Sequence, residues 1–292
     1  VFLQCGFLLR IDQFPALPKA VFHGMQLVCL RRRFPSERRF FLKKHKDKAA
    51  PFLVVLALLV FWEAVVRINQ IPLYVLPAPT SVLSAVVTEW PNLLRHGLIT
   101  VAEALGGMAI SLAVALLTGI LMDRFPLVKR CIYPLLIVTQ TVPMLVLAPI
   151  LIIYMGFGMA PKILTVVLMC FFPIAVSFTD GMAGLDKGYE NLVRSCGAKG
   201  FQIYWLVKLP AAVPSLLSGL KVAATYSISG AIVGEWIGSQ AGLGYYLLRL
   251  KNNYMLDKVF ACVLVIILLS LAMNGLIGLF RLLFFPSLRK RR

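Results

Sequence analysis

The sequence predicts an all-α protein that crosses a membrane several times. Hydrophobic residues make up 60% of the 292-residue chain and the mean hydropathy is +0.85. These values are too high for a soluble protein, whose surface would have to be mostly polar. The alternation of lipid-facing and lumen-facing residues that is typical of a membrane β-strand is not seen in the apolar stretches. We therefore expect a polytopic helical membrane protein.

Six segments are suitable as transmembrane helices, because about 30 Å of hydrocarbon takes roughly 20 helical residues. They lie at about 50–68, 98–122, 131–155, 161–180, 211–236 and 258–282. In the third segment Thr141-Val142-Pro143 and Pro149, and in the fourth Pro173, are expected to loosen the backbone hydrogen bonds.

These segments define the expected organisation. A transmembrane domain covers 49–285, between a basic N-terminal tail, 1–48, and a basic C-terminal tail, 286–292. Because the sequence opens with Val1, one interpretation of 1–48 is initiation at Met25 or a misassigned start, and another is a disordered or surface-lying tail.

The net charge of +18 is distributed unevenly across the six predicted spans. The basic residues of both tails and of the connections after spans two and four fall on one side. The opposite side holds Arg95, Lys162, Arg249 and Lys251. This positive-inside pattern places both termini and the 187–210 connection in the cytoplasm. Anionic lipid headgroups are a sufficient partner for the excess charge, and no nucleic-acid partner is expected.

The longest polar interruption in the second half of the chain is Tyr189 to Pro210, with the sequence YENLVRSCGAKGFQIYWLVKLP. Its two ends, 189–195 and 199–207, are each expected to form a short amphipathic helix. Gly197 between them suits a left-handed hinge. Pro210 is expected to stop the second helix. The segment would then form a stiff knob at the membrane surface.

This segment resembles the EAA loop of ABC-importer permeases, the binding-protein-dependent transport inner-membrane component family. The family pattern is roughly E-A-A, three residues, G, nine residues, I-x-L-P. Gly197, Val207, Leu209 and Pro210 stand at its G, I, L and P, while Asn191 stands at the E, with Glu190 one place early. The resemblance runs from Leu76-Pro77-Ala78-Pro79 through Gly242-Leu243-Gly244 to the final helix. It is strongest to the subgroup that imports nitrate, sulfonates, taurine and pyrimidine precursors of thiamine.

The resemblance implies the type I ABC importer permease fold, in a homodimer in a bacterial inner membrane. It also implies an ATPase subunit that binds the loop and an external substrate-binding protein. The coupling residues would be Glu190, Asn191, Gly197, Ala198, Val207, Leu209 and Pro210. This chain would be no enzyme and would bind no cofactor, with ATP and Mg on the ATPase. Consistent with this, it contains no G-x-x-x-x-G-K-[ST] phosphate loop.

The resemblance leaves the imported solute open. A thiamine-related pyrimidine precursor is the first expectation, and an aliphatic sulfonate, taurine or nitrate is the alternative. An ion-coupled secondary transporter is a further alternative, although neither inverted repeats nor an ionisable relay are convincing in the sequence. Scattered cysteines and histidines predict no catalytic or metal site.

Pathway residues are sought among polar and small residues inside spans. Glu103 in the second span is expected to face protein or the pathway, because a buried acid is costly. In the fifth span, Ser227, Ser229, Gly230 and Gly234 could line a path or serve helix packing. Glu63 and Glu235 each adjoin a tryptophan near an external span end and are expected to reach the headgroups.

Replacing Gly197 by tryptophan tests the predicted coupling role. We expect Gly197→Trp to insert normally, because the loop lies outside the bilayer, but to hydrolyse ATP without transport. Parallel assays of membrane insertion, ATPase activity and solute uptake check this. Normal uptake by the variant would contradict the assignment.

Overall fold

The computed structural model describes residues 49–186, 188, 191, 194–195 and 200–284. Regular structure in these ranges is entirely helical, which confirms the predicted all-α class. Both predicted tails, 1–48 and 286–292, lie outside the described residues. The first described helix, α4 (Ala49–Ile68), has nearly the bounds of the first predicted span, but it is not among the candidate membrane spans found in the described residues. The chain separates into two units within α4, and the unit from Trp62 onward holds the remaining helices.

Four helices of this second unit are long and apolar enough to cross a membrane. They are α6 (Trp90–Arg124), α9 (Met159–Ala183), α12 (Leu209–Trp236) and α14 (Leu256–Phe284). These helices confirm the second, fourth, fifth and sixth predicted spans. The largest difference in bounds is at α6, which begins at Trp90 instead of residue 98. The helix α9 runs without a break past Pro173.

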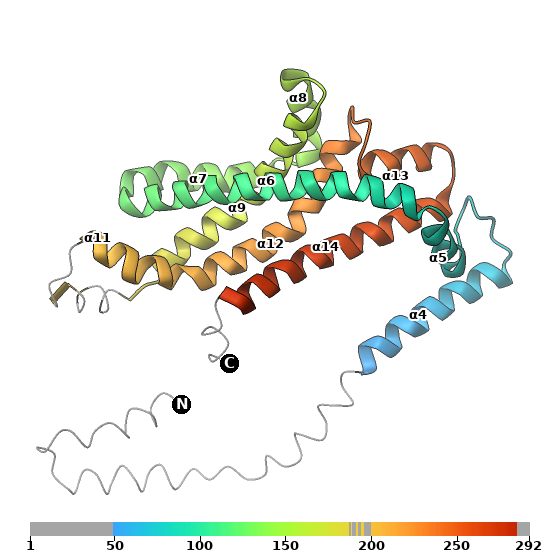
Figure 1. The fold of residues 1–292 in the computed structure, drawn as a ribbon, viewed down its shortest axis with the longest axis horizontal. Coiled ribbons are helices and arrows are strands. Elements are labelled where there is room, and N and C mark those ends of the chain that lie inside the picture. The colour runs from blue at the N-terminus through green and yellow to red at the C-terminus, as the bar shows by residue number, and fades with distance from the viewer. Residues whose placement is uncertain (1–48, 187, 189–190, 192–193, 196–199, 285–292) are drawn as a thin grey trace, which may run out of the picture. The chain divides into compact units, whose positions relative to one another are not determined.

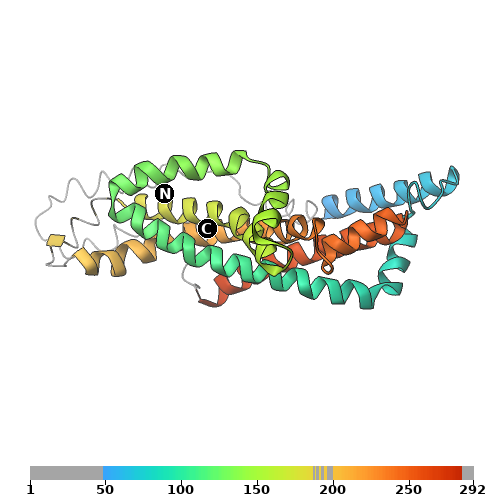
Figure 2. The ribbon, with the colours of Figure 1, turned by 90° about the horizontal axis from the view of Figure 1, so that it is seen from above.

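The third predicted span is broken where its sequence predicts weakness. It forms α7 (Pro126–Thr141) and α8 (Met144–Met155), which are bent by 102° relative to each other. Figure 2 shows α8 turning away from α7. Pro143 lacks an N–H donor and forces Val142 into an extended conformation, with φ −82° and ψ 120°. The pair is therefore a broken span or a re-entrant loop.

The segment that precedes α12, 200–208, differs from the sequence expectation. The short helix α11 (Gly200–Ile203) continues into a π-helix, η2 (Tyr204–Lys208), which runs directly into α12. The prediction that Pro210 stops a helix is therefore wrong. Pro210 lies in the first turn of α12, where a missing N–H is tolerated, and the widened π-turn precedes it.

Two short helices, α5 (Pro79–Thr88) and α13 (Leu243–Asn252), were not among the predicted spans. Glu89, between α5 and α6, holds them to the bundle. It forms an ion pair with Lys258 at the start of α14 and accepts a hydrogen bond from the Tyr246 hydroxyl of α13. The bond to Lys258, with help from Tyr246, lowers the pKa of Glu89 to about 2. This carboxylate therefore stays charged at neutral pH.

The core lies where α9 packs between α6 and α12, and α9 and α12 run side by side (Figure 1). Glycines allow this close approach. A Cβ added to Gly107 of α6 would lie 2.5 Å from Val166 of α9, and one added to Gly219 of α12 would lie 2.5 Å from the Pro173 carbonyl oxygen. Backbones in direct contact leave little freedom for α9 and α12 to move separately.

A pair of glycine variants tests this packing. Gly219→Ala should lower the unfolding temperature in detergent, because the new methyl group meets backbone, and overpacking costs about 1–3 kcal/mol. Gly106→Ala in α6 is the matched control, since its Cβ meets nothing within 4 Å. Alanine there should leave stability unchanged or raise it by up to about 1 kcal/mol. Equal unfolding temperatures for the two variants would contradict the packing argument.

Candidate functional site

The predicted coupling residues are only partly within the described structure. Glu190, Gly197 and Ala198 lie outside the described residues, and Asn191 is helical and exposed. On the C-terminal side of the loop, Val207 belongs to η2, and Leu209 and Pro210 open α12. Val207 and Leu209 are half-buried and Pro210 is exposed. The coupling role of these residues remains a prediction.

The segment 200–208 has one exposed side and one side anchored to the bundle. Phe201 and Trp205, one helical turn apart, are 75% and 56% exposed, and their rings lie 5.9 Å apart. Exposed aromatic side chains at a surface are typical of a protein contact. This side is therefore available to a partner.

The anchored side is formed by Tyr204 and Lys208. The Tyr204 hydroxyl donates to the Met182 sulphur of α9 at 3.3 Å, and the Lys208 ammonium pairs with Asp123 at the end of α6 at 3.1 Å. Burial, together with the charge of Asp123, raises the pKa of Tyr204 to about 12, so the phenol stays protonated and can donate. The segment is thus tied to both α6 and α9.

Two of the predicted pathway residues of α12, Gly230 and Gly234, face α9, and Ser227 is buried in the bundle. Ser227 is fully buried and donates to the Ala224 carbonyl. A Cβ on Gly230 would lie 3.2 Å from the Val166 Cα, and one on Gly234 would lie 3.0 Å from the Lys162 Cα. These positions fit the helix-packing alternative, and their role in a pathway stays a prediction.

Glu103 is fully buried and forms an ion pair with Lys162 of α9, Oε1 to Nζ, at 2.9 Å. Within the described part of the chain, its second oxygen, Oε2, has no hydrogen-bond partner. The buried Glu103 carboxylate needs the opposite charge of Lys162, because desolvation costs several kcal/mol per ion. The pair therefore fixes α6 to the first turn of α9.

The prediction that Glu235 reaches the headgroups is wrong. It is fully buried, accepts a hydrogen bond from Thr100 of α6 at 2.6 Å, and accepts another from the Gly244 amide at 2.6 Å. A Cβ on Gly242 would lie 2.1 Å from the Glu235 carboxylate, and Gly242 has φ +108°. The Gly242-Leu243-Gly244 motif therefore needs its glycines to wrap around this carboxylate.

Glu63 has a capping role in the structure. Its carboxylate pairs with Arg67 and accepts hydrogen bonds from the Thr80 amide and hydroxyl. Thr80 lies in the first turn of α5, where an acidic group satisfies free N–H groups. Glu63 thus holds the 69–78 connection closed.

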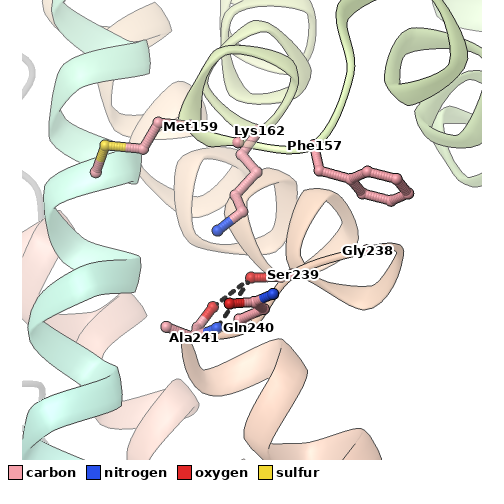
Figure 3. Close-up of a pocket in the computed structure, with 8 residues that line it drawn as sticks. Phe157, Met159, Lys162, Gly238, Ser239, Gln240 and Ala241 are labelled. Carbon is pink, nitrogen blue, oxygen red and sulfur yellow. Dashed lines mark hydrogen bonds between the residues drawn. The ribbon is translucent and has the colours of Figure 1, made fainter.

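A pocket of about 660 Å³ lies at the end of α9 and α12 that is remote from η2. Figure 3 shows the Lys162 ammonium pointing toward the connection from α12 to α13. The Ser239 hydroxyl there is hydrogen-bonded to Ala241. The pocket is lined by Phe157, Gly158, Met159, Lys162, Gly238, Ser239, Gln240 and Ala241. Among the described residues, no group of three side chains could hold a metal ion.

Sequence reasoning missed one set of polar residues, on the exposed face of α12. The missed residues are Ser218, Lys221 and Thr225, which share this face with Ser229, a residue that the sequence had indicated, and all four are exposed. Thr225 also accepts a hydrogen bond from the Asn274 side-chain amide of α14 at 2.8 Å. The signal was present in the sequence, because Lys221 stands near the middle of an apolar segment. The residues considered inside the predicted spans were carboxylates, serines and glycines, and no lysine was among them.

Comparisons with known proteins agree with this architecture. One relative, a probable ABC transporter permease protein of Haemophilus influenzae, is 30% identical over 223 residues, 76% of this chain and 91% of its own. Another, the formylaminopyrimidine transport permease protein ThiX of Halalkalibacterium halodurans, is 34% identical over 231 residues, 79% of this chain and 92% of its own.

A solved structure shares the fold. It is a crystal structure of an amino acid ABC transporter with histidines, with a TM-score of 0.56 at 17% identity over 66% of this chain and 94% of that chain. A sequence profile of the family described as binding-protein-dependent transport system inner membrane component matches residues 111–285. The chain therefore belongs to this family and is a multi-pass membrane permease of the ABC importer type.

Proposed function

We propose that the chain is the permease subunit of an ATP-driven importer of a thiamine-related pyrimidine precursor. The observation that carries the choice of solute is the 34% identity, over most of both chains, to a permease named for formylaminopyrimidine transport. In this proposal the chain itself performs no chemistry. It provides a gated path, and another subunit supplies the energy.

The energy source in this proposal is a separate ATPase subunit that binds ATP and Mg. It contacts the 187–210 loop in the cytoplasm, where the positive-inside pattern would put the loop and both termini. The exposed pair Phe201 and Trp205 supports a docking surface on this loop. The anchored residues Tyr204 and Lys208 support transfer of movement to α9 and α6.

The proposed assembly contains a second copy of the chain and an external substrate-binding protein in a bacterial inner membrane. The second copy would complete the path, because in one protomer the polar residues Ser218, Lys221, Thr225 and Ser229 of α12 are exposed. The binding protein would deliver solute at the end remote from the loop, near the Lys162 pocket.

ATP can change access to such a path only through contacts that differ between two conformations. Because α9 and α12 contact each other backbone to backbone, we expect them to move as one body. Movement of the loop would therefore reach the remote end of both helices together.

Reconstitution tests the function directly. Proteoliposomes containing the chain, its ATPase and its binding protein should accumulate formylaminopyrimidine with ATP and Mg, and not with ADP. Omitting the binding protein is the control for delivery. ATP-independent uptake driven by an ion gradient would overturn the proposal, and uptake of taurine or nitrate alone would reassign the solute.

The Asp123–Lys208 ion pair tests transfer of movement from the loop. Asp123→Asn and Lys208→Met should each lower the solute transported per ATP several-fold, because η2 would move without α6. Stability should change little, since partly exposed ion pairs contribute about 0–1 kcal/mol. The measurement is uptake divided by ATP hydrolysed.

The exchanged pair Asp123→Lys with Lys208→Asp should recover much of the coupling. Arg130→Met, which removes an exposed charge in α7, is the matched control and should behave as wild type. Unchanged coupling in both single variants, or no recovery in the exchanged pair, would refute this role.

A further inference from the structure

The two sides of α12 have different surroundings. One side packs against α9 through Gly219, Gly230 and Gly234. The other side carries exposed polar residues at spacings of three and four, which place them on one helical face. We call this set, Ser218, Lys221, Thr225 and Ser229, the polar face.

The polar face lies in the central part of a membrane-spanning helix. Lys221 is twelve residues from Leu209 and fifteen from Trp236, or about 18 Å and 22 Å at 1.5 Å per residue. A lysine at the centre of a span costs about 2.5–3.5 kcal/mol in lipid. Contact of this face with lipid is therefore unfavourable.

A carboxylate elsewhere in the same chain is also a poor partner for the Lys221 ammonium. Among the described residues, the carboxylates of the long helices include Glu63, Glu103 and Glu235, and each of these three is already bonded within its own protomer. Asp123, at the end of α6, pairs with Lys208, and Asp257 lies in the first turn of α14. The exposed Asp180 lies beside Gly181, whose Cβ position is 3.1 Å from Ala212, near the loop end of α12. A second copy would bring the same set of carboxylates.

We propose that Lys221, together with Thr225 and Ser229, lines the solute path and that its ammonium binds a hydrogen-bond-accepting or anionic group of the solute. This inference rests on the proposed function. The Thr225 and Ser229 hydroxyls donate to the carbonyls of Lys221 and Thr225 at 3.5 Å, and their oxygens can accept from the solute or from water beside it. Asn274, bonded to Thr225, extends the polar face onto α14.

Two kinds of solute offer this chemistry. Formylaminopyrimidine presents a neutral formyl oxygen and ring nitrogens, whereas taurine and nitrate present anionic oxygens. Substitutions of Lys221 distinguish the two cases. Lys221→Gln retains a neutral donor, so it should spare part of the affinity for a neutral acceptor and little of the affinity for an anion.

Thiol labelling tests exposure to water without any solute. Thr225→Cys and Ser229→Cys, in a chain whose six own cysteines are alanine, should react with a membrane-impermeant thiosulfonate in the complex with the ATPase. Reaction is expected in the nucleotide-free or the ATP-bound state. Ala223→Cys and Ala231→Cys, buried on the opposite side of α12, are matched controls and should not react. Labelling of neither polar-face cysteine in either state would overturn the inference.

Transport kinetics test the contact with solute. For the solute that the wild-type complex transports, Lys221→Met should raise KM about tenfold to a hundredfold, the loss expected for a hydrogen bond to a charged group. Lys221→Arg should retain most of the affinity. Lys251→Met, at an exposed lysine of α13 outside the spans, should behave as wild type.

The two experiments separate the two proposals. A wild-type complex that transports none of the three probes counts against the proposed solute, while labelling still decides whether the polar face lines a path. Transport by Lys221→Met with unchanged KM and rate would overturn the solute contact.

Discussion

The close packing of α9 against α12 is the constraint on which the rest of the structure depends. Glycine positions at both ends of the contact, Gly181 and Gly234, bring backbone within about van der Waals distance. One end of the pair continues into η2, which Lys208 ties to α6, and the other end carries Lys162 and Glu235. Because the contact is between backbones, it transmits displacement with little side-chain adjustment.

Charged groups inside this apolar bundle divide into two kinds. Glu103 with Lys162, and Glu235 with Thr100, are buried and bonded between elements far apart in the sequence, and Glu235 also accepts from the nearby Gly244 amide. Such groups fix the register of neighbouring helices, because moving one helix would leave the Glu103–Lys162 charges unpaired or the buried Glu235 side chain without its hydrogen bonds. Lys221 belongs to the other kind, since it is exposed in mid-span and forms no ion pair with the residues of one protomer that the structure describes.

The fold was largely predictable because its signals are local. Apolar segments of sufficient length form helices. The third segment is interrupted at Val142-Pro143, since proline restricts the residue before it and lacks an N–H donor. The polar contacts were not predictable. Glu235 appeared to be an interfacial residue because its partner Thr100 is 135 positions away, and only the fold brings them together. The helical continuation through Pro210 was missed because proline fits a first helical turn as readily as it ends a helix.

The geometry of α12 connects movement of the loop to affinity for the solute. Lys221 lies about 18 Å along the helix from Leu209, so a rigid tilt of about 10° about the loop end would move its Cα by about 3 Å. A hydrogen bond weakens steeply once donor and acceptor separate beyond about 3.5 Å, so this movement is enough to break a contact between Lys221 and a bound solute. Two conformations of the pair α9 and α12 would then bind the solute with different affinity, and that difference is what an external energy source needs in order to drive release on one side. A mobile α12 alone could not do this, because its movement would be absorbed at its packing face. The close contact with α9 would therefore let a tilt that begins at the loop reach Lys221.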